Sequence, residues 1–126
     1  MFNYLCDNVR CIDADTLEVD IDLGFGVWKR KEKLRLYGIN AYEKKTVRGQ
    51  EAMKFVTNLF THADILEIVL DSRKDKDMFD KFGRYLAIVT INYKNGSSVM
   101  VNKLLLDKGF AVLYLIDTDE AMKLFS

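Results

Sequence analysis

The stretch LEVDIDLGFGVWKRKEKLRL, residues 17–36, decides the fold. Apolar residues alternate with acidic ones through its first half: Leu17, Val19, Ile21 and Leu23. This period of two is typical of a half-buried strand. Gly24 and Gly26 interrupt the pattern, and a basic run leads into a second alternating segment with Leu34 and Leu36 inward. The stretch therefore predicts an antiparallel pair of strands.

The pattern changes to steps of three and four residues from Val47 onward, which predicts an amphipathic helix of about four turns. Its apolar stripe consists of Ala52, Met53, Val56, Leu59, Phe60 and Ala63. Strand character returns at residues 65–71 and 84–93. We expect the stripe on the helix to cover one opening of a barrel formed by these strands.

Turn and cap signals divide the last third of the chain. Asn95-Gly96 predicts a two-residue hairpin turn, after which Val99 and Val101 continue the partner strand. Asn102 is expected to cap a short helix, and Gly109 to end it. The final residues, DEAMKLFS, are expected to form one or two helical turns.

These elements predict a β-barrel with helices, in the α+β class. We expect a five-stranded OB-type Greek-key barrel with a long helix after strand 3 and one or two short helices near the C-terminus. A chain of 126 residues suits one domain over residues 1–126. By itself, such a barrel suggests only the binding of oligonucleotides or oligosaccharides.

Composition sets limits on location and partners. Nineteen Lys and Arg balance nineteen Asp and Glu, so net charge does not attract a polyanion and local clustering would have to do so. No window approaches the roughly 18 apolar residues of a membrane span, and the N-terminal segment lacks a signal-peptide pattern. We therefore expect a soluble protein without a membrane partner, with the cytoplasm and a monomer favoured. Cys6 and Cys11 are five positions apart in an expected strand. Because this number is odd, their side chains are expected to face opposite ways and to form no disulfide bond.

Five segments carry a resemblance to a known family. They are CIDADTLEVD (11–20), LRLYGINAYE (34–43), GQEAMKF (49–55), DKFGRYLA (80–87) and VNKLLLDKGFA (101–111). In this order and spacing they resemble the staphylococcal nuclease family, whose patterns include D-G-D-T, R-L-x-G-I-D-x-P-E and D-K-Y-G-R. The resemblance covers roughly residues 9–115. It implies a phosphodiester hydrolase on an OB-type barrel.

The resemblance assigns three catalytic residues. Glu43 matches the acid that activates or positions the attacking water, a role that requires hydrogen-bond reach to that water. Arg35 and Arg84 match the two arginines that hold the phosphate, for which the planar guanidinium fork is well suited. The alternative for Glu43 is a solvated loop residue, and for each arginine a surface ion pair.

The resemblance also implies a Ca²⁺ site. Asp15 matches the principal ligand, with Asp13 available through a water molecule, and Ala41 would contribute its main-chain carbonyl. Asn40 stands where the family has a second aspartate, so one negative charge is missing. Because calcium affinity depends on the number of charged ligands, we expect weaker calcium binding or a shifted metal preference.

Further positions bear on the substrate and on the loop. Lys81 and Phe82 are expected to contact phosphate and base, and Tyr114 to stack on a base. Tyr42 replaces a proline, which should loosen the loop before Glu43 unless Tyr42 packs against something. Ala14 replaces a glycine and would be strained if that position needed a positive φ.

The sequence therefore predicts a calcium-dependent nuclease that acts on single-stranded or frayed DNA and RNA. A catalytically weakened barrel that binds nucleic acid or a protein is the alternative, motivated by Asn40 and Tyr42. An oligosaccharide-binding barrel would require clustered aromatic residues on one face, and no convincing cluster is found.

Overall fold

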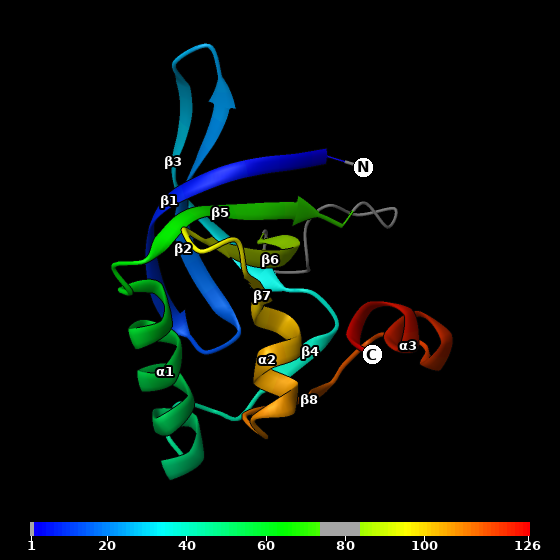
Figure 1. Ribbon diagram of the computed structural model, residues 1–126. Helices are drawn as coiled ribbons and strands as arrows, with labels where there is room; N and C mark the ends of the chain where they lie inside the picture. The colour runs from blue at the N-terminus through cyan, green and yellow to red at the C-terminus, as the bar shows by residue number, and fades with distance from the viewer. Residues whose placement is uncertain (1, 74–83) are drawn as a thin grey trace.

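A closed barrel of five strands forms the centre of the protein, of which the computed structural model describes residues 2–73 and 84–126 (Figure 1). The barrel strands are β1 (Phe2–Asp13), β2 (Thr16–Gly24), β3 (Val27–Leu36), β5 (Ile65–Ser72) and β6 (Tyr85–Tyr93). Adjacent strands pair antiparallel, except that the end of β3 pairs parallel with the start of β6. That parallel pairing closes the ring in a Greek-key order of the OB type.

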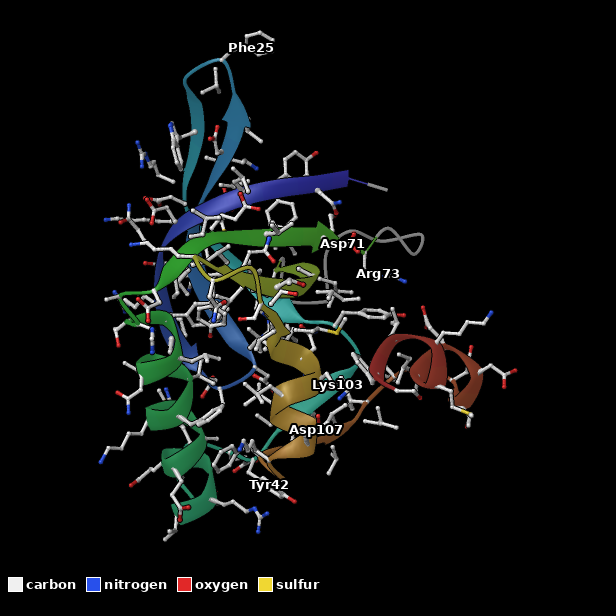
Figure 2. All side chains as sticks on the ribbon, viewed as in Figure 1. Phe25, Tyr42, Asp71, Arg73, Lys103 and Asp107 are labelled. Carbon is white, nitrogen blue, oxygen red and sulfur yellow. The ribbon has the colours of Figure 1, made fainter. Side chains whose placement is uncertain are left out.

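The barrel interior is filled by alternate strand residues. Leu17, Leu34, Leu36 and Ile91 have no exposed surface, as expected for inward positions. Helix α1 (Val47–Phe60) begins after the Thr46 cap and packs Ala52 and Val56 into the same core. The β2–β3 hairpin extends away from the helices, with Phe25 at its tip (Figure 2).

Five shorter elements complete the chain. They are β4 (Ile39–Ala41), β7 (Ser98–Met100), α2 (Val101–Asp107), β8 (Ala111–Leu113) and α3 (Thr118–Phe125). β7 extends the edge of the sheet beside β6, whereas β4 and β8 form a separate two-stranded sheet. None of the described helices is long and apolar enough to cross a membrane.

The predicted fold class is confirmed. The barrel has five strands of OB type, the long helix follows the third of them, and two short helices lie near the C-terminus. The hairpin after β6 differs in length from the prediction: Tyr93 N–H donates to the Ser97 carbonyl (2.8 Å), so three residues form the turn instead of two. Gly96 occupies its left-handed position, at φ +90°.

Asn102 does not cap α2, contrary to the prediction. The helix already begins at Val101, which was expected to be in a strand, and Met100 is its N-cap. The Asn102 side chain is instead fully buried. Its amide makes three hydrogen bonds, with Val89 N–H (3.0 Å), the Tyr37 carbonyl (2.9 Å) and the Ala87 carbonyl (3.2 Å). The residue therefore joins α2 to β6 and to Tyr37, which directly follows β3.

The two cysteines are free, but the reason given for it was wrong. Both Cys6 and Cys11 pack against the core instead of facing opposite ways. The register of β1 against β2 shifts between Asp7 and Arg10, and Asn8 adopts a positive φ of 52° there. Such a bulge resets the alternation of side chains along the strand.

We expect Asn102→Ala to lower the free energy of unfolding by about 3 kcal/mol, because it removes the side-chain partner of the buried Val89 N–H and of the Tyr37 carbonyl, whereas the Ala87 carbonyl still accepts from Tyr37 N–H. Urea unfolding followed by circular dichroism measures this change. Asn58→Ala, on the exposed face of α1, is the control and should change stability by less than about 0.5 kcal/mol. Equal effects of the two substitutions would contradict the structural role of Asn102.

Candidate active site

Arg35 is the centre of a hydrogen-bonded cluster at the end of β3, although only 8% of the residue is exposed. Its neighbours Leu34 and Leu36 fill the barrel, so strand alternation directs Arg35 to the outer face. The guanidinium donates from Nη1 to the Ile39 carbonyl (3.0 Å), and from Nη2 to Asp15 Oδ2 (3.3 Å) and Asn40 Oδ1 (2.8 Å). A charge buried to this extent needs such partners. Arg35 therefore fixes the β1–β2 turn against β4.

Asp15 extends the cluster to the second predicted arginine. Its Oδ2 also accepts a hydrogen bond from Ala41 N–H (2.9 Å), and its Oδ1 accepts one from the Thr16 hydroxyl (3.1 Å). The same hydroxyl accepts a hydrogen bond from Arg84 Nη1 (3.2 Å). Arg35, Asp15, Thr16 and Arg84 thus form one continuous network across the β1–β2 turn, β3 and the start of β6.

Asn40 and Ala41 lie on β4, whose pairing with β8 holds them beside Arg35. Tyr114 follows β8, and its backbone N–H donates to the Gly38 carbonyl (2.9 Å). The Arg35 guanidinium lies over the Tyr114 ring, 5.0 Å from its centroid. Tyr114, predicted to stack on a base, therefore covers the arginine in this structure and keeps 39% of its own surface exposed.

Glu43 lies two residues beyond β4, in the exposed loop before α1. The helix cap fixes this loop: the Thr46 hydroxyl donates to the Glu43 carbonyl (2.7 Å) and accepts from Gly49 N–H (2.9 Å). Within the described part of the chain, the Glu43 carboxylate makes no hydrogen bond or ion pair. The loop thus has a fixed backbone and presents a solvated carboxylate.

The Tyr42 side chain packs against another residue, so the loop before Glu43 keeps its rigidity. The Arg48 guanidinium lies over the Tyr42 ring, 5.2 Å from its centroid, and Tyr42 N–H donates to the Phe110 carbonyl (3.4 Å). Arg48 Nε also donates to the Gly109 carbonyl (2.9 Å). These contacts tie the loop to the residues after α2, and Figure 2 shows Tyr42 at the lower end of α1.

The remaining predicted positions divide in two. Lys81 and Phe82 lie outside the described residues. Ala14 is buried, with 1% exposed, and is not among the described residues with positive φ, so replacing glycine at this position causes no backbone strain.

The side-chain oxygen atoms that bond Arg35 are of the type that a hard cation prefers, but together they carry only one negative charge. One guanidinium nitrogen bonds both Asp15 Oδ2 and Asn40 Oδ1, so these two oxygens lie close together. Calcium prefers carboxylate and carbonyl oxygens of this kind. Among residues 2–73 and 84–126, no group of three or more His, Cys, Asp and Glu could hold a metal ion. Asp15 Oδ2 and Asn40 Oδ1 are thus oxygens of the type that calcium takes as ligands, and they carry one carboxylate charge between them.

Cys11 lies close enough to Asp13 and Asp15 for their charges to affect its thiol, but this thiol is unsuited to metal ligation or nucleophilic attack. Burial raises the pKa of its thiol to about 11, assisted by the negative charges of Asp13 and Asp15 and opposed by a hydrogen bond with Thr57. The thiol therefore stays protonated at neutral pH, whereas metal ligation and nucleophilic attack need the thiolate.

Residues 33–125 match the family model described as staphylococcal nuclease homologue. The match covers well over half of the chain. The chain belongs to the staphylococcal nuclease homologue family. The resemblance inferred from the sequence motifs is thereby confirmed, and no curated protein matches the chain significantly.

The family match includes Arg35, Glu43 and Arg84 but leaves out Asp15, which precedes its first residue. The structure links Asp15 to the matched region by the hydrogen bonds from Arg35 and Ala41. The β1–β2 turn is thus part of the same cluster as the residues within the family match.

Two residues of the site were not singled out in the sequence. Thr16 joins the two arginines through Asp15. The sequence feature that could have identified Thr16 is a polar residue next to an aspartate at the start of a barrel strand. Arg48 holds Tyr42, yet it is one of many basic residues on exposed positions. Its other partner, the Gly109 carbonyl, comes from a distant segment, so no local pattern marks Arg48 as part of the site.

We expect Gly49→Ala to destabilise the protein by about 2 kcal/mol, although alanine favours helices over glycine by about 1 kcal/mol. A Cβ atom at this position would overlap the Glu43 carbonyl and displace the loop. The sign of the change in urea midpoint checks this expectation. Gln50→Ala, on an exposed position of the same turn, is the matched control. Stabilisation by Gly49→Ala would show that the Glu43 backbone does not pack as described.

Proposed function

We propose that this protein is a calcium-dependent nuclease that hydrolyses phosphodiester bonds of single-stranded or frayed DNA and RNA. The observation that carries the proposal is the continuous network of Arg35, Asp15, Thr16 and Arg84. It brings two guanidinium groups and a carboxylate to one place on the barrel wall. Membership of the staphylococcal nuclease homologue family supports the reaction class.

The two arginines bind the phosphate in this mechanism. Arg35 uses three of its N–H groups on Ile39, Asp15 and Asn40, which leaves two for phosphate oxygens within the described part of the chain. Its internal bonds hold the guanidinium in place before substrate arrives, so little reorganisation is needed. Arg84, fixed through Thr16, binds a second oxygen. Both stabilise the negative charge that increases on these oxygens as phosphorus becomes five-coordinate.

Glu43 accepts the proton of the attacking water. Its carboxylate is solvated and its loop is fixed by the Thr46 cap and by Tyr42, which supports a role in accepting a proton from a water molecule. The water oxygen forms a bond to phosphorus, and the bond from phosphorus to the 5′-oxygen breaks with its electron pair going to that oxygen.

Asp15, Asn40 and the Ala41 carbonyl are the residues that would hold Ca²⁺. When bound, the ion neutralises charge on the phosphate and orients it. The shared hydrogen bonds from Arg35 bring Asp15 Oδ2 and Asn40 Oδ1 together, and the Ala41 N–H bond to Asp15 holds β4 beside them, which supports this assignment.

We expect Glu43→Gln to lower the rate of calcium-dependent cleavage of labelled single-stranded DNA by about 100-fold or more, because the amide cannot accept the proton. Gel analysis of the products over time measures the rate, with a chelator as a second control. Glu51→Gln, an exposed acid on α1, is the matched variant and should cleave like the parent protein.

Two results of this assay would change the conclusion. Cleavage by Glu43→Gln at the parent rate would remove Glu43 from the mechanism. If the parent protein binds the DNA without any chelator-sensitive cleavage, the weakened barrel that acts as a binding module is the correct function.

We expect Asn40→Asp to tighten calcium binding about tenfold, since it restores a second carboxylate beside Asp15. Isothermal titration calorimetry with calcium alone measures the dissociation constant without reference to activity. Asn58→Asp adds the same charge on the exposed face of α1 and should have no effect. An unchanged dissociation constant for Asn40→Asp would mean that residue 40 does not contact the ion.

A further inference from the structure

Helix α3 is held to the barrel by one carboxylate. Glu120, in the first turn of α3, accepts hydrogen bonds from the Tyr37 hydroxyl at Oε1 (2.7 Å) and from Arg73 Nη2 at Oε2 (3.3 Å). The Arg73 guanidinium also lies over the Tyr37 ring, 5.3 Å from its centroid. Tyr37 directly follows β3 and Arg73 directly follows β5, so Glu120 ties α3 to the ends of two barrel strands. Figure 1 shows α3 on the far side of α2 from α1.

Gly38 is the point where apolar side chains of the C-terminal segment meet the barrel. A Cβ atom at Gly38 would lie 3.1 Å from Ile116 Cδ1 and 3.2 Å from the Phe125 ring, so both side chains pack directly against the Gly38 backbone. The Gly38 carbonyl also accepts the hydrogen bond from Tyr114 N–H (2.9 Å). Tyr114, the residue that leads into α3 and the end of α3 are therefore all in contact with one residue.

Leu115 connects these contacts through a strained backbone. Its φ is +51°, a conformation that is costly for a bulky side chain. The residue is 81% exposed, so packing of the Leu115 side chain does not offset this cost. Such a conformation persists where the surrounding structure fixes the neighbouring residues. Tyr114 is bonded to Gly38 and Ile116 packs against Gly38, so the position of Tyr114 is coupled to the packing of the segment that enters α3.

We propose that α3 holds Tyr114 over the Arg35 guanidinium, with Glu120 as the positioning residue. The ring centroid lies 5.0 Å from the Arg35 guanidinium. The N–H groups of a guanidinium all lie in its plane, so a ring over one face blocks none of them. The ring excludes water from that face, and an ionic contact is stronger where water is excluded. Tyr114 in this position therefore strengthens the bond between Arg35 and a phosphate oxygen.

This role of Glu120 rests on the proposed function in one respect, namely that Arg35 binds phosphate. Glu120 itself acts at a distance, because its carboxylate oxygens bond Tyr37 and Arg73. The position of Tyr114 can be measured without substrate, so the structural part of the role is testable whether or not the protein cuts nucleic acid.

The test follows the Arg35 Nε–H signal in NMR spectra of the whole ¹⁵N-labelled protein. A ring over the guanidinium shields this proton, so Tyr114→Leu should move the signal to higher frequency. Glu120→Ala removes both bonds of the carboxylate and should move the signal in the same direction. Glu120→Gln keeps an acceptor for the Tyr37 hydroxyl and should give an intermediate shift. Asp119→Ala, an exposed acid in the same helical turn, is the matched control and should leave the signal unchanged.

Titration with inorganic phosphate, followed by the same signal, measures the effect on binding. We expect Tyr114→Leu to weaken phosphate binding about threefold, which corresponds to the loss of a cation–π contact at a partly exposed ring. Glu120→Ala should weaken it by up to the same factor, and Asp119→Ala should not. A parent protein that binds no phosphate would refute the proposed role of Arg35, whereas the Arg35 signal would still test the role of α3.

Tyr37→Phe keeps the test decisive if Glu120→Ala does not fold, because it removes only the hydroxyl that bonds Glu120. An Arg35 signal that stays in place in the folded variants of Tyr37 and Glu120 would overturn the positioning role. Equal shifts caused by Glu120→Ala and Asp119→Ala would overturn it as well. If the signal moves but the affinity for phosphate does not change, the effect of Tyr114 on binding is refuted.

Discussion

The buried charge of Arg35 is the constraint on which the site depends. A guanidinium with 8% of its residue exposed requires acceptors on several sides, and it finds them in a turn carboxylate, an amide oxygen and a main-chain carbonyl. Those acceptors belong to the β1–β2 turn and to β4, so satisfying one side chain joins β3 and the β4 segment just after it to a turn 20 residues earlier in the chain. Removing Asp15 would leave that charge uncompensated, which costs far more than the pair contributes when intact. The interactions that order the site therefore also stabilise the fold.

Much of the fold could be predicted because its signals are local. Alternation marks β2 and β3, the change to a helical period marks α1, and Gly109 ends α2 at φ +74°. The errors arose where tertiary contacts override local preference. Asn102 looks like a helix cap in sequence, but it is needed inside the protein to satisfy backbone groups of Tyr37, just after β3, and of β6. No pattern near Asn102 reveals those partners.

For the site as well, the residue types could be predicted from the sequence, whereas the tertiary contacts could not. The residue types and spacing that resemble the nuclease family identified Arg35, Asp15 and Asn40, and the structure brings these three into direct contact. The supporting contacts could not be predicted: Thr16 joins Asp15 to the distant Arg84, and Arg48 joins the Tyr42 loop to the distant Gly109. The replacement of proline by Tyr42 illustrates the point. Rigidity that proline would supply through its own ring comes here from stacking with Arg48, which only the folded chain reveals.

The charge balance of the site implies that calcium and phosphate binding are coupled in the proposed reaction. Arg35 and Arg84 together carry two positive charges, whereas Asp15 carries one negative charge and Asn40 none. Before substrate binds, this cluster therefore attracts an anion better than a cation. A bound phosphate adds the negative charge that Asn40 lacks and supplies further oxygen ligands. Calcium and phosphate should accordingly favour each other's binding, and this coupling is reciprocal. A second carboxylate would weaken the coupling, because the cation site would then be complete without the substrate.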